Sequence, residues 1–362
     1  MRLVPIAVIG KGNVGKALLR QLSDMKAPFR QRGIDLRVTA VVGKSAGLYV
    51  QGGIPDGTLG DLASGRAKIE KAKAGEGPAG GWEEVTANIA ASGSLGQIVV
   101  DATAEDDARV HAEWLKHGWH VVTANKRPLT GPLLHYDAML AGRDRPEAPC
   151  YRYEATVGAG LPIISTIQDM LATGDEVIDI RAAVSGTLGF LFSACEEGTP
   201  FSAAVAEAKA RGYTEPDPRD DLSGADVARK ALILARLLGQ RKEMKDIPAE
   251  SLVPEDLADV DTATFMKDLG LHSRGIDDRF RDVARRKHTL RYLLTVTPED
   301  VRVGIEEVPA GLAFGARKGP ENMFIIRTRR YNALPLVIRG PGAGAEVTAA
   351  GIFNDILRII RH

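Results

Sequence analysis

The stretch "LVPIAVIGKGNVGKALLRQL", residues 3–22, decides the fold of the first half of the chain. An apolar run leads into Gly10-x-Gly12-x-x-Gly15, and helix-compatible sequence follows. In such a strand–turn–helix unit the first glycine permits the tight turn. The second lets a pyrophosphate approach the backbone, and the third lets the helix pack against the strand. Because the helix N-terminus then faces the phosphate charge, we predict a dinucleotide-binding loop here.

The alternation of strand and helix patterns continues to about residue 150. Strand patterns occupy residues 35–43, 96–104 and 119–125, and a helical pattern occupies residues 107–118. This alternation indicates an α/β fold with a parallel sheet. The stretch rich in Gly, Ala and Lys between Gly60 and Gly81 is interpreted as an excursion with a short helix. We predict a Rossmann-type, doubly wound nucleotide-binding domain over residues 1–150.

The end of the second strand bears on the choice between NAD and NADP. A carboxylate there normally binds the free 2′-hydroxyl of NAD. The sequence reads "VVGKSAG", residues 41–47, and offers no acid. Lys44, with Ser45, could receive a 2′-phosphate instead, which favours NADP. The alternative is an ordinary loop lysine, and residue type alone does not separate the two.

Two other strand ends should face the cofactor, because ligands bind beyond the carboxyl ends of parallel strands. The segment "VDATAED", residues 100–106, offers Thr103. The segment "VVTANKRPLT", residues 121–130, delivers Asn125 and Lys126 to the same edge. Lys126 could contact a substrate carboxylate or carbonyl, or it could be an ordinary solvent-exposed lysine of the loop.

Composition narrows the class of protein. With 362 residues, 44% of them hydrophobic and 26% charged, the chain has the profile of a globular protein of about two domains. Its 47 basic and 47 acidic residues cancel, so no net field favours nucleic acid or a membrane.

The two cysteines, Cys150 and Cys195, are too few for a disulfide framework and suit a reducing compartment, which makes cytoplasm the expectation. The apolar runs are too short to span a bilayer, and we expect no signal peptide.

The segment "GYTEPDPRDDLSGADVARK", residues 212–230, is an acidic loop that enters an apolar helix. Ser223 is a suitable N-cap with Asp226 three residues on, which predicts a capping box. Asp226 and Lys230 also form an i,i+4 pair, worth about 0.2–0.5 kcal/mol to a helix. These features need no catalytic role. The alternative is a binding site for an amino-acid ammonium group, in which Glu215 and other acids lie near a partly buried Lys230.

The segment "YRYEATVGAGLPIISTIQDML", residues 151–171, combines Glu154 with a glycine-rich turn before a helix. Such a turn could direct carbonyl oxygens and the carboxylate at a hard cation, or it could be a helix entry beside the cofactor. Four antiparallel strand patterns follow later, at residues 288–298, 300–309, 322–331 and 335–340. We predict a second, α+β domain over residues 151–340 and a closing helix over residues 341–362 that returns to the nucleotide-binding domain.

Five segments, in this order, resemble homoserine dehydrogenases. They are "GKGNVGKALL" (10–19), "VTANKRPLT" (122–130), "YEATVGAGLPII" (153–164), "GYTEPDPRDDLSGADVARK" (212–230) and "PLVIRGPGAGAEVTAAGIFNDI" (335–356). The resemblance spans nearly the whole chain. It implies reduction of L-aspartate 4-semialdehyde to L-homoserine with NAD(P)H, in the route to threonine and methionine. It also implies a homodimer built by the second domain, in the short form without kinase or regulatory domains.

The resemblance further implies catalytic and substrate-binding residues. Lys230 would act at the reacting oxygen, Asp226 would position it or belong to the proton path, and Lys126 would be a second active-site lysine. The substrate-binding positions would be Glu215, which takes the ammonium group, with Asp221, Thr187 and Tyr213. A positioned ammonium suits this chemistry, because hydride transfer to an aldehyde leaves negative charge on oxygen.

Cation and cofactor positions follow from the same resemblance. A monovalent cation, Na+ or K+, would be held by Glu154 and the carbonyls of Val157, Ala159 and Leu161. The cofactor, NADP with NAD possible, would contact Gly10, Gly12, Asn13, Val14, Gly15, Lys44, Thr103, Asn125, Lys126 and Gly344. Gly344 lies in the glycine-rich entry to the closing helix, which would face the nicotinamide.

Two rival functions remain. A phosphorylating semialdehyde dehydrogenase needs a nucleophilic cysteine near a histidine. Cys195, however, falls in an apolar helical pattern, where packing is its commonest role. The other rival is an NADP-binding sensor that has lost turnover. The presence of Lys126, Glu215, Asp226 and Lys230 argues against it.

Overall fold

The computed structural model describes residues 1–69, 81–93, 96–106, 108–140, 145, 147–317 and 319–361. Residues 70–80 of the predicted excursion lie outside this range. The chain forms two compact units, Met1–Pro162 with Ala343–His362, and Ile163–Gly342. The boundary predicted at residue 150 falls inside the first unit.

The first unit contains a six-stranded sheet in the order β3-β2-β1-β4-β5-β6. Its strands are β1 Arg2–Ile9, β2 Ile34–Val42, β3 Gly47–Tyr49, β4 Ile98–Asp101, β5 His120–Thr123 and β6 Tyr151–Arg152. All the neighbouring pairs are parallel except β2 with β3. The parallel α/β prediction is therefore confirmed. Because β6 pairs with β5, the chain stays in this sheet beyond residue 150.

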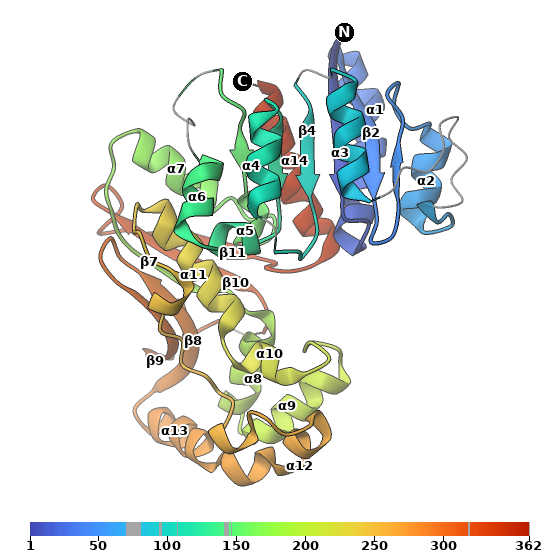
Figure 1. Cartoon of the computed structure of the whole chain (residues 1–362). Helices are drawn as coiled ribbons and strands as arrows, with labels where there is room; N and C mark the ends of the chain where they lie inside the picture. The colour runs from blue at the N-terminus through green and yellow to red at the C-terminus, as the bar shows by residue number, and fades with distance from the viewer. Residues whose placement is uncertain are drawn as a thin grey trace. The chain divides into compact units, whose positions relative to one another are not determined.

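Helices cover both faces of this sheet. They are α1 Asn13–Gln31, α2 Asp56–Ser64, α3 Trp82–Ala91, α4 Ala108–Lys116, α5 Arg127–Thr130, α6 Leu133–Leu140 and α14 Ala345–Arg361. Figure 1 shows α3 and α4 on one face and α1 and α14 on the other. Because α14 follows the second unit in the sequence, the last helix of the chain completes the first unit.

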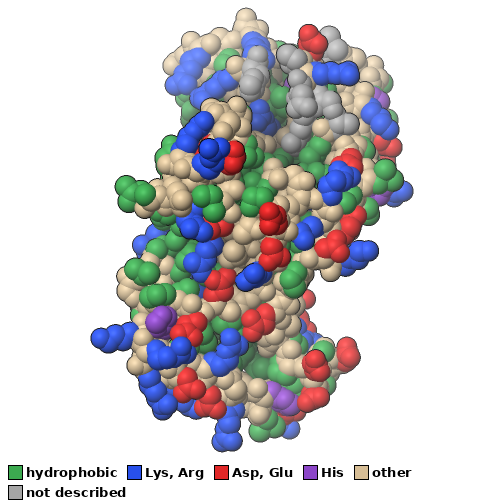
Figure 2. Space-filling view, turned by 90° about the vertical axis from the view of Figure 1, so that its left-hand side faces the viewer, with side chains coloured by type: hydrophobic (Ala, Val, Ile, Leu, Met, Phe, Trp, Pro, Cys, Tyr) green, Lys and Arg blue, Asp and Glu red, His purple; other side chains and the backbone are tan. Residues whose placement is uncertain are grey.

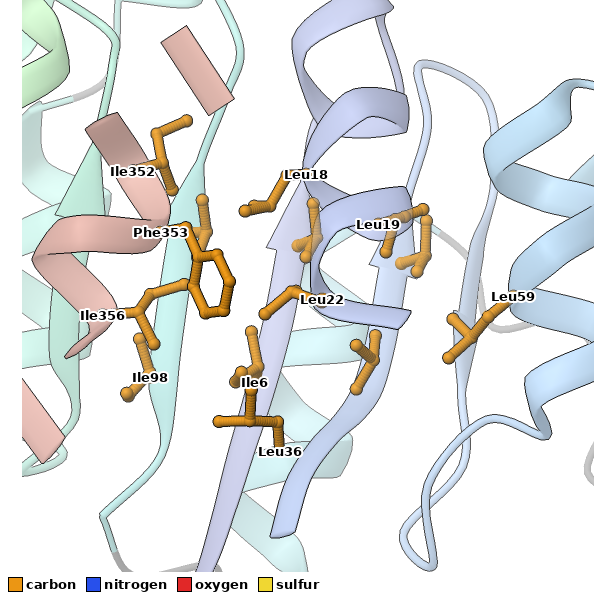
Figure 3. Close-up of a cluster of buried hydrophobic side chains, with 14 of the residues drawn as sticks. Ile6, Leu18, Leu19, Leu22, Leu36, Leu59, Ile98, Ile352, Phe353 and Ile356 are labelled. Carbon is orange, nitrogen blue, oxygen red and sulfur yellow. The ribbon is translucent and has the colours of Figure 1, made fainter. Parts of the chain in front are cut away.

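The core of the first unit is built between α1, α14 and the sheet. In Figure 3, side chains of α14 such as Phe353 and Ile356 point toward Leu22 of α1, beside Ile6 and Ile98 of the central strands. Burial of one such side chain stabilises a fold by about 1.5–3 kcal/mol. The C-terminal helix is thus part of the core that positions the predicted dinucleotide-binding loop.

The second unit contains a five-stranded sheet in the order β11-β10-β7-β8-β9. Its strands are β7 Val177–Ala183, β8 His288–Val296, β9 Val301–Pro309, β10 Asn322–Thr328 and β11 Leu336–Gly340. The four pairings between neighbours are antiparallel. The four strand patterns near the end of the sequence are therefore confirmed, and β7 is their central partner.

The helices of the second unit come mainly from the sequence between β7 and β8. They are α7 Ile164–Ala172, α8 Gly186–Glu196, α9 Phe201–Ala210, α10 Pro218–Leu222, α11 Ala225–Leu237, α12 Thr262–His272 and α13 Arg274–Arg285. Helices α8, α11 and α13 pack against β8. This packing fixes the beginnings of α8 and α11, where the predicted substrate residues lie.

The predicted N-cap of α11 is wrong. The cap is Gly224, with a φ of 71°, and Asp226 is the second helical residue. Residues 218–222 form their own helix, α10, whose N-cap is Asp217 and whose C-cap is Ser223. The chain must reverse between two adjoining helices, and glycine adopts the left-handed conformation that this requires. Ser223 still contributes, because its Oγ accepts a hydrogen bond from the Ala225 amide at 3.3 Å.

Surface charge agrees with the balanced composition. Figure 2 shows basic and acidic side chains interspersed over the face that it presents. Over the part of the chain that the structure describes, no helix is both long and apolar enough to cross a membrane.

Candidate functional site

The glycines of the first loop have distinct roles. Gly10 has a φ of +102°, and a Cβ there would lie 2.7 Å from the Ala102 carbonyl carbon and oxygen. A Cβ at Gly15 would lie 2.0 Å from the Gly10 oxygen, whereas Gly12 has open space around it. Gly12 is the N-cap of α1, followed by Asn13 and Val14, and offers no side-chain cap to the helix. Packing therefore requires two of the glycines, and Gly12 leaves the backbone accessible to a ligand.

A groove of about 1100 Å³ lies beside this loop in the first unit. Among the predicted cofactor residues it is lined by Gly10, Gly12, Lys44 and Thr103. Residues not predicted from the sequence also line it, including Lys11, Lys68 and Trp82. Lys11 occupies a variable position of the glycine motif, and its Nζ donates to the Ala67 carbonyl at 3.1 Å. Lys68 comes from the excursion, where no motif marks it.

The turns after β4 and β5 meet at the carboxyl edge of the sheet, as predicted. Asn125 is buried, and its Nδ2 donates to Asp101 Oδ2 at 3.0 Å and to the Glu105 carbonyl at 2.7 Å. Its Oδ1 accepts from the Arg127 amide at 3.1 Å. The Asn125 side chain therefore joins the two turns to each other. Lys126 follows it as the N-cap residue of α5.

Asp101 connects these turns to the interior of the first unit. Its Oδ1 accepts from the Thr103 amide at 2.8 Å, and its Oδ2 lies 3.0 Å from His111 Nε2. His111 Nδ1 in turn lies 2.9 Å from the Tyr151 hydroxyl. Burial raises the pKa of Asp101, but the hydrogen bonds from His111 and Thr103 outweigh it, so the pKa is lowered. No sequence motif identifies this group, here called the Asp101 network: Asp101, His111, Tyr151 and Asn125.

The entry to the last helix also belongs to the first unit. Gly344 has a φ of +119°, and its carbonyl accepts from the Thr348 amide at 3.0 Å. A residue with a side chain would be strained in this conformation. The glycine-rich entry predicted before the closing helix is thus a turn that requires glycine at this position.

In the second unit, Lys230 lies on the buried side of α11. It is 8% exposed, and its Nζ donates to the Val184 carbonyl at 2.7 Å. The Asp226 carboxylate, one turn earlier, lies 2.8 Å from the same nitrogen. A buried ammonium is costly unless it is paired and hydrogen-bonded, and both conditions hold here. The predicted pairing of Asp226 with Lys230 therefore holds the amine in a defined place.

The predicted substrate residues gather at the first turn of α8. The Thr187 hydroxyl lies 2.7 Å from the Tyr213 carbonyl oxygen and 2.9 Å from Asp221 Oδ1, and it can donate to either. Asp221 Oδ2 accepts from the Glu215 amide at 2.8 Å. The Glu215 and Tyr213 side chains are exposed, and so can meet a ligand. Since Val184 lies three residues before Thr187, Lys230 is anchored at the same end of α8.

The acidic segment, residues 212–222, is anchored by hydrogen bonds and an ion pair. Arg219 pairs with Asp217 and donates from Nη1 to the carbonyls of Leu257, Ala258 and Val260. The hydrogen bonds from Arg219 hold the pKa of Asp217 well below its usual value. Asp217 is therefore a structural residue, and this anchoring of the Glu215 segment was not predicted.

The predicted cation ligands Glu154, Val157, Ala159 and Leu161 all lie in the first unit. Glu154 is 3% exposed, and its amide donates to Asp355 Oδ2 at 2.8 Å. Burial raises the pKa of Asp355 to about 7. Gly158 and Ala159 follow with φ values of 89° and 56°, an unusual conformation for alanine. Among the residues that the structure describes, no group of three or more His, Cys, Asp or Glu could hold a metal ion.

Cys195 does not resemble a nucleophile. Cys195 is buried in α8, and burial raises the pKa of its thiol to about 12. A thiol with such a pKa stays protonated at neutral pH, and the thiolate is the reactive form. Cys150 and Cys195 are both free thiols.

The chain matches two family models. The model described as "Homoserine dehydrogenase, NAD binding domain" covers residues 10–145, and "Homoserine dehydrogenase" covers residues 162–357. A homoserine dehydrogenase from Emericella nidulans is 35% identical over 99% of this chain and 98% of its own length. A solved structure of a Candida auris protein of unknown function has a TM-score of 0.89 and 32% identity, and covers 100% of this chain and 99% of its own.

A bifunctional aspartokinase/homoserine dehydrogenase from Daucus carota is 40% identical over 99% of this chain. The chain spans 38% of that relative's length. The two family models together cover both compact units, and their order agrees with the observed architecture. The chain therefore belongs to the homoserine dehydrogenase family.

Proposed function

We propose that the chain catalyses the NAD(P)-dependent interconversion of L-homoserine and L-aspartate 4-semialdehyde, in threonine and methionine biosynthesis. The observation that carries the proposal is the buried Lys230 ammonium, held by Val184 and Asp226 at the start of α8, where Thr187 and Asp221 meet. Hydride transfer to an aldehyde leaves negative charge on oxygen. A positioned ammonium stabilises that charge and donates a proton to it.

Several residues of the chain have distinct roles in this reaction. The bound nicotinamide cofactor supplies or accepts the hydride. Lys230 holds the proton for the substrate oxygen, and Asp226 and the Val184 carbonyl fix its Nζ. Glu215 binds the substrate ammonium, and Asp221 orients the Glu215 backbone. Lys126, at the carboxyl end of β5, is the second active-site lysine.

The proposal is tested by assaying the purified protein with L-homoserine and either NADP or NAD, in sodium and in potassium buffers. We expect a homoserine-dependent increase in the absorbance of the reduced nicotinamide. A folded protein that binds NADPH but shows no such reaction in any of these conditions would instead be a sensor.

We further propose that the enzyme prefers NADP. Support comes from Lys11, Lys44 and Lys68, which line the groove, and from the absence of an acid in residues 41–47. Lys44→Glu is expected to raise the KM for NADP by about tenfold or more, because a charge-assisted contact is worth about 1.5–3 kcal/mol. The KM for NAD should change far less. Lys116→Glu, on the exposed side of α4, is the matched control. Equal changes with both cofactors would contradict the role of Lys44.

We also propose a monovalent-cation site formed by Glu154 and the carbonyls of Val157, Ala159 and Leu161. The residues fit such an ion, because Glu154 and Asp355 are buried carboxylates of adjoining segments. A left-handed alanine costs roughly 1–2 kcal/mol and tends to persist at functional sites. Such an ion would compensate buried negative charge and rigidify the turn.

This cation proposal predicts a stability difference. NaCl or KCl should raise Tm above its value in choline chloride at equal ionic strength, by about 2–4 °C per kcal/mol of binding free energy. Glu154→Gln should remove most of that difference. If the three salts give the same Tm for the unsubstituted protein, the site does not bind these ions.

Replacing the cysteines tests the phosphorylating rival. The double substitution Cys150→Ser and Cys195→Ala should leave the rate of homoserine oxidation within about threefold of the unsubstituted protein. We expect this because neither thiol takes part in the proposed reaction and both replacements are small. Native protein should also resist iodoacetamide at Cys195, as mass spectrometry can show. Loss of activity at unchanged Tm would favour a cysteine nucleophile.

We propose a cytoplasmic homodimer formed by the second unit. Support for the dimer comes from the exposed apolar side chains of Leu334, just before the outer strand β11, and of Val337, within that strand. Support for a reducing compartment comes from the two free thiols. A monomer in sedimentation velocity at micromolar concentration would contradict the dimer.

A further inference from the structure

Asp101 directly precedes the turn that lines the cofactor groove, and it lines a smaller neighbouring pocket with Thr103, Glu105 and His111. It is 3% exposed and stands at the end of β4. Its two oxygens receive the Thr103 amide, the Asn125 side-chain amide and His111 Nε2, at 2.8, 3.0 and 3.0 Å. Thr103 and Glu105, in the turn that follows Asp101, both line the groove. Asn125 also donates to the Glu105 carbonyl, so one carboxylate is hydrogen-bonded to groups of both turns.

His111 also contacts this carboxylate. It is 2% exposed on α4, and its two ring nitrogens face Asp101 and the Tyr151 hydroxyl. The neutral Nε2–H tautomer is compatible with both contacts. Nε2–H donates to Asp101, and the tyrosine hydroxyl donates to the unprotonated Nδ1. The chain of contacts thus runs from β6, through α4, to the turn that lines the groove.

We propose that Asp101 is a positioning residue for the nicotinamide-facing turns, and that His111 holds the Asp101 carboxylate in the orientation this requires. The proposal rests on the proposed function, because it assigns these turns to the cofactor site. The donors that Asp101 gathers come from the turn after β4, the turn after β5 and helix α4. Without the carboxylate, these donors lose their common acceptor, and the turns lose their fixed separation.

Asp101→Asn tests this directly. The new amide nitrogen must face either the Thr103 amide or the donors of Asn125 and His111, so a donor opposes a donor in both orientations. We expect a rise of about tenfold or more in the Kd for NADPH and a fall of about 10–100-fold in kcat, since small displacements of site groups have effects of this size. NADPH fluorescence measures the first, and homoserine oxidation measures the second.

Asp35→Asn is the matched control. Asp35 is also buried in the same sheet, but it lies near the start of β2 and pairs with Arg30 and Arg37. Its loss should lower Tm without changing the Kd for NADPH or the kcat per folded molecule. If Asp101→Asn behaves in the same way, its role is structural and the proposal is overturned.

A pair of substitutions at His111 keeps the test decisive if Asp101→Asn does not fold. Glutamine can place its amide nitrogen near the position of Nε2, whereas asparagine reaches only the position of Nδ1. His111→Gln should therefore stay within about threefold of the unsubstituted protein, and His111→Asn should resemble the expected Asp101→Asn, given the sensitivity of supporting residues. Nitrogen-15 NMR should show the Nε2–H tautomer of His111. Equal effects of the two substitutions would overturn the role of His111.

The readouts separate this inference from the proposed function. NADPH binding is measured without homoserine, so Asp101 can be tested in a protein that shows no turnover. Absent turnover with intact NADPH binding refutes the activity alone. Absent binding of either cofactor by the unsubstituted protein refutes both.

Discussion

Lys230→Met is expected to lower kcat for homoserine oxidation by about 10²–10⁴-fold, the range for loss of a general acid or base. Methionine keeps an apolar stem in the buried face of α11 and removes the ammonium that pairs with Asp226 and Val184. The Kd for NADPH should change little, because the Rossmann loop lies in the other compact unit. The measurement is steady-state turnover, with cofactor binding followed by fluorescence and folding by circular dichroism.

Two further variants locate the cause of that loss. Asp226→Asn should give a smaller fall in kcat, because the Val184 carbonyl still receives Lys230. Arg285→Ala, which removes an exposed helix pair with Asp282 in the same unit, should leave kcat unchanged. If Lys230→Met retains more than about a tenth of the turnover, a general acid–base role for this lysine is untenable.

The sequence predicts the architecture well where periodicity is long. Strands such as β1 and β2, with 8 and 9 residues, carry enough apolar positions to identify them. Strands β3 and β6 have three and two residues, too few to show any period, and both were missed. The boundary between the units therefore shifted, because it depends on where the short strand β6 pairs.

The sequence contains a signal for the start of the short helix α10 that our prediction did not use. Asp217 precedes Pro218, and an acid followed by proline is a favourable N-cap and first helical residue. Interpreting that pair as a helix start would have moved Ser223 to the end of α10. Gly224 would then have been the natural turn before α11.

The candidate site also contains residues that could be predicted from the sequence and residues that could not. Lys230 and Asp226 could be predicted, since they lie one turn apart in a distinctive segment. The Asp101 network could not, because Asp101 and Tyr151 are far apart in sequence and meet only in the folded sheet. Arg219 likewise anchors its segment through the backbone carbonyls of Leu257, Ala258 and Val260, and every residue has a carbonyl, so no residue type marks this contact in a sequence.

Gly224→Ala should both destabilise the second unit and lower kcat. At its φ of +71°, an alanine costs about 1–2 kcal/mol of backbone free energy. The new Cβ would also lie 2.0 Å from the Tyr292 hydroxyl, and such overpacking costs about 1–3 kcal/mol more. Relief requires α11 to move at its N-terminus, and this carries Asp226 and Lys230 away from the start of α8. Denaturant unfolding and turnover measure the two effects.

The backbone and packing contributions can be separated. Gly212→Ala meets the same left-handed conformation, at +70°, but has no atom within 4 Å, so it should show the backbone cost alone. Tyr292→Phe removes the hydroxyl that donates to the Glu250 carbonyl at 2.7 Å and opens space beside Gly224. Combined with Gly224→Ala, it should recover part of the lost stability and turnover, giving a coupling free energy of about 0.5–3 kcal/mol. Strictly additive effects in this cycle would mean that Tyr292 does not set the position of α11.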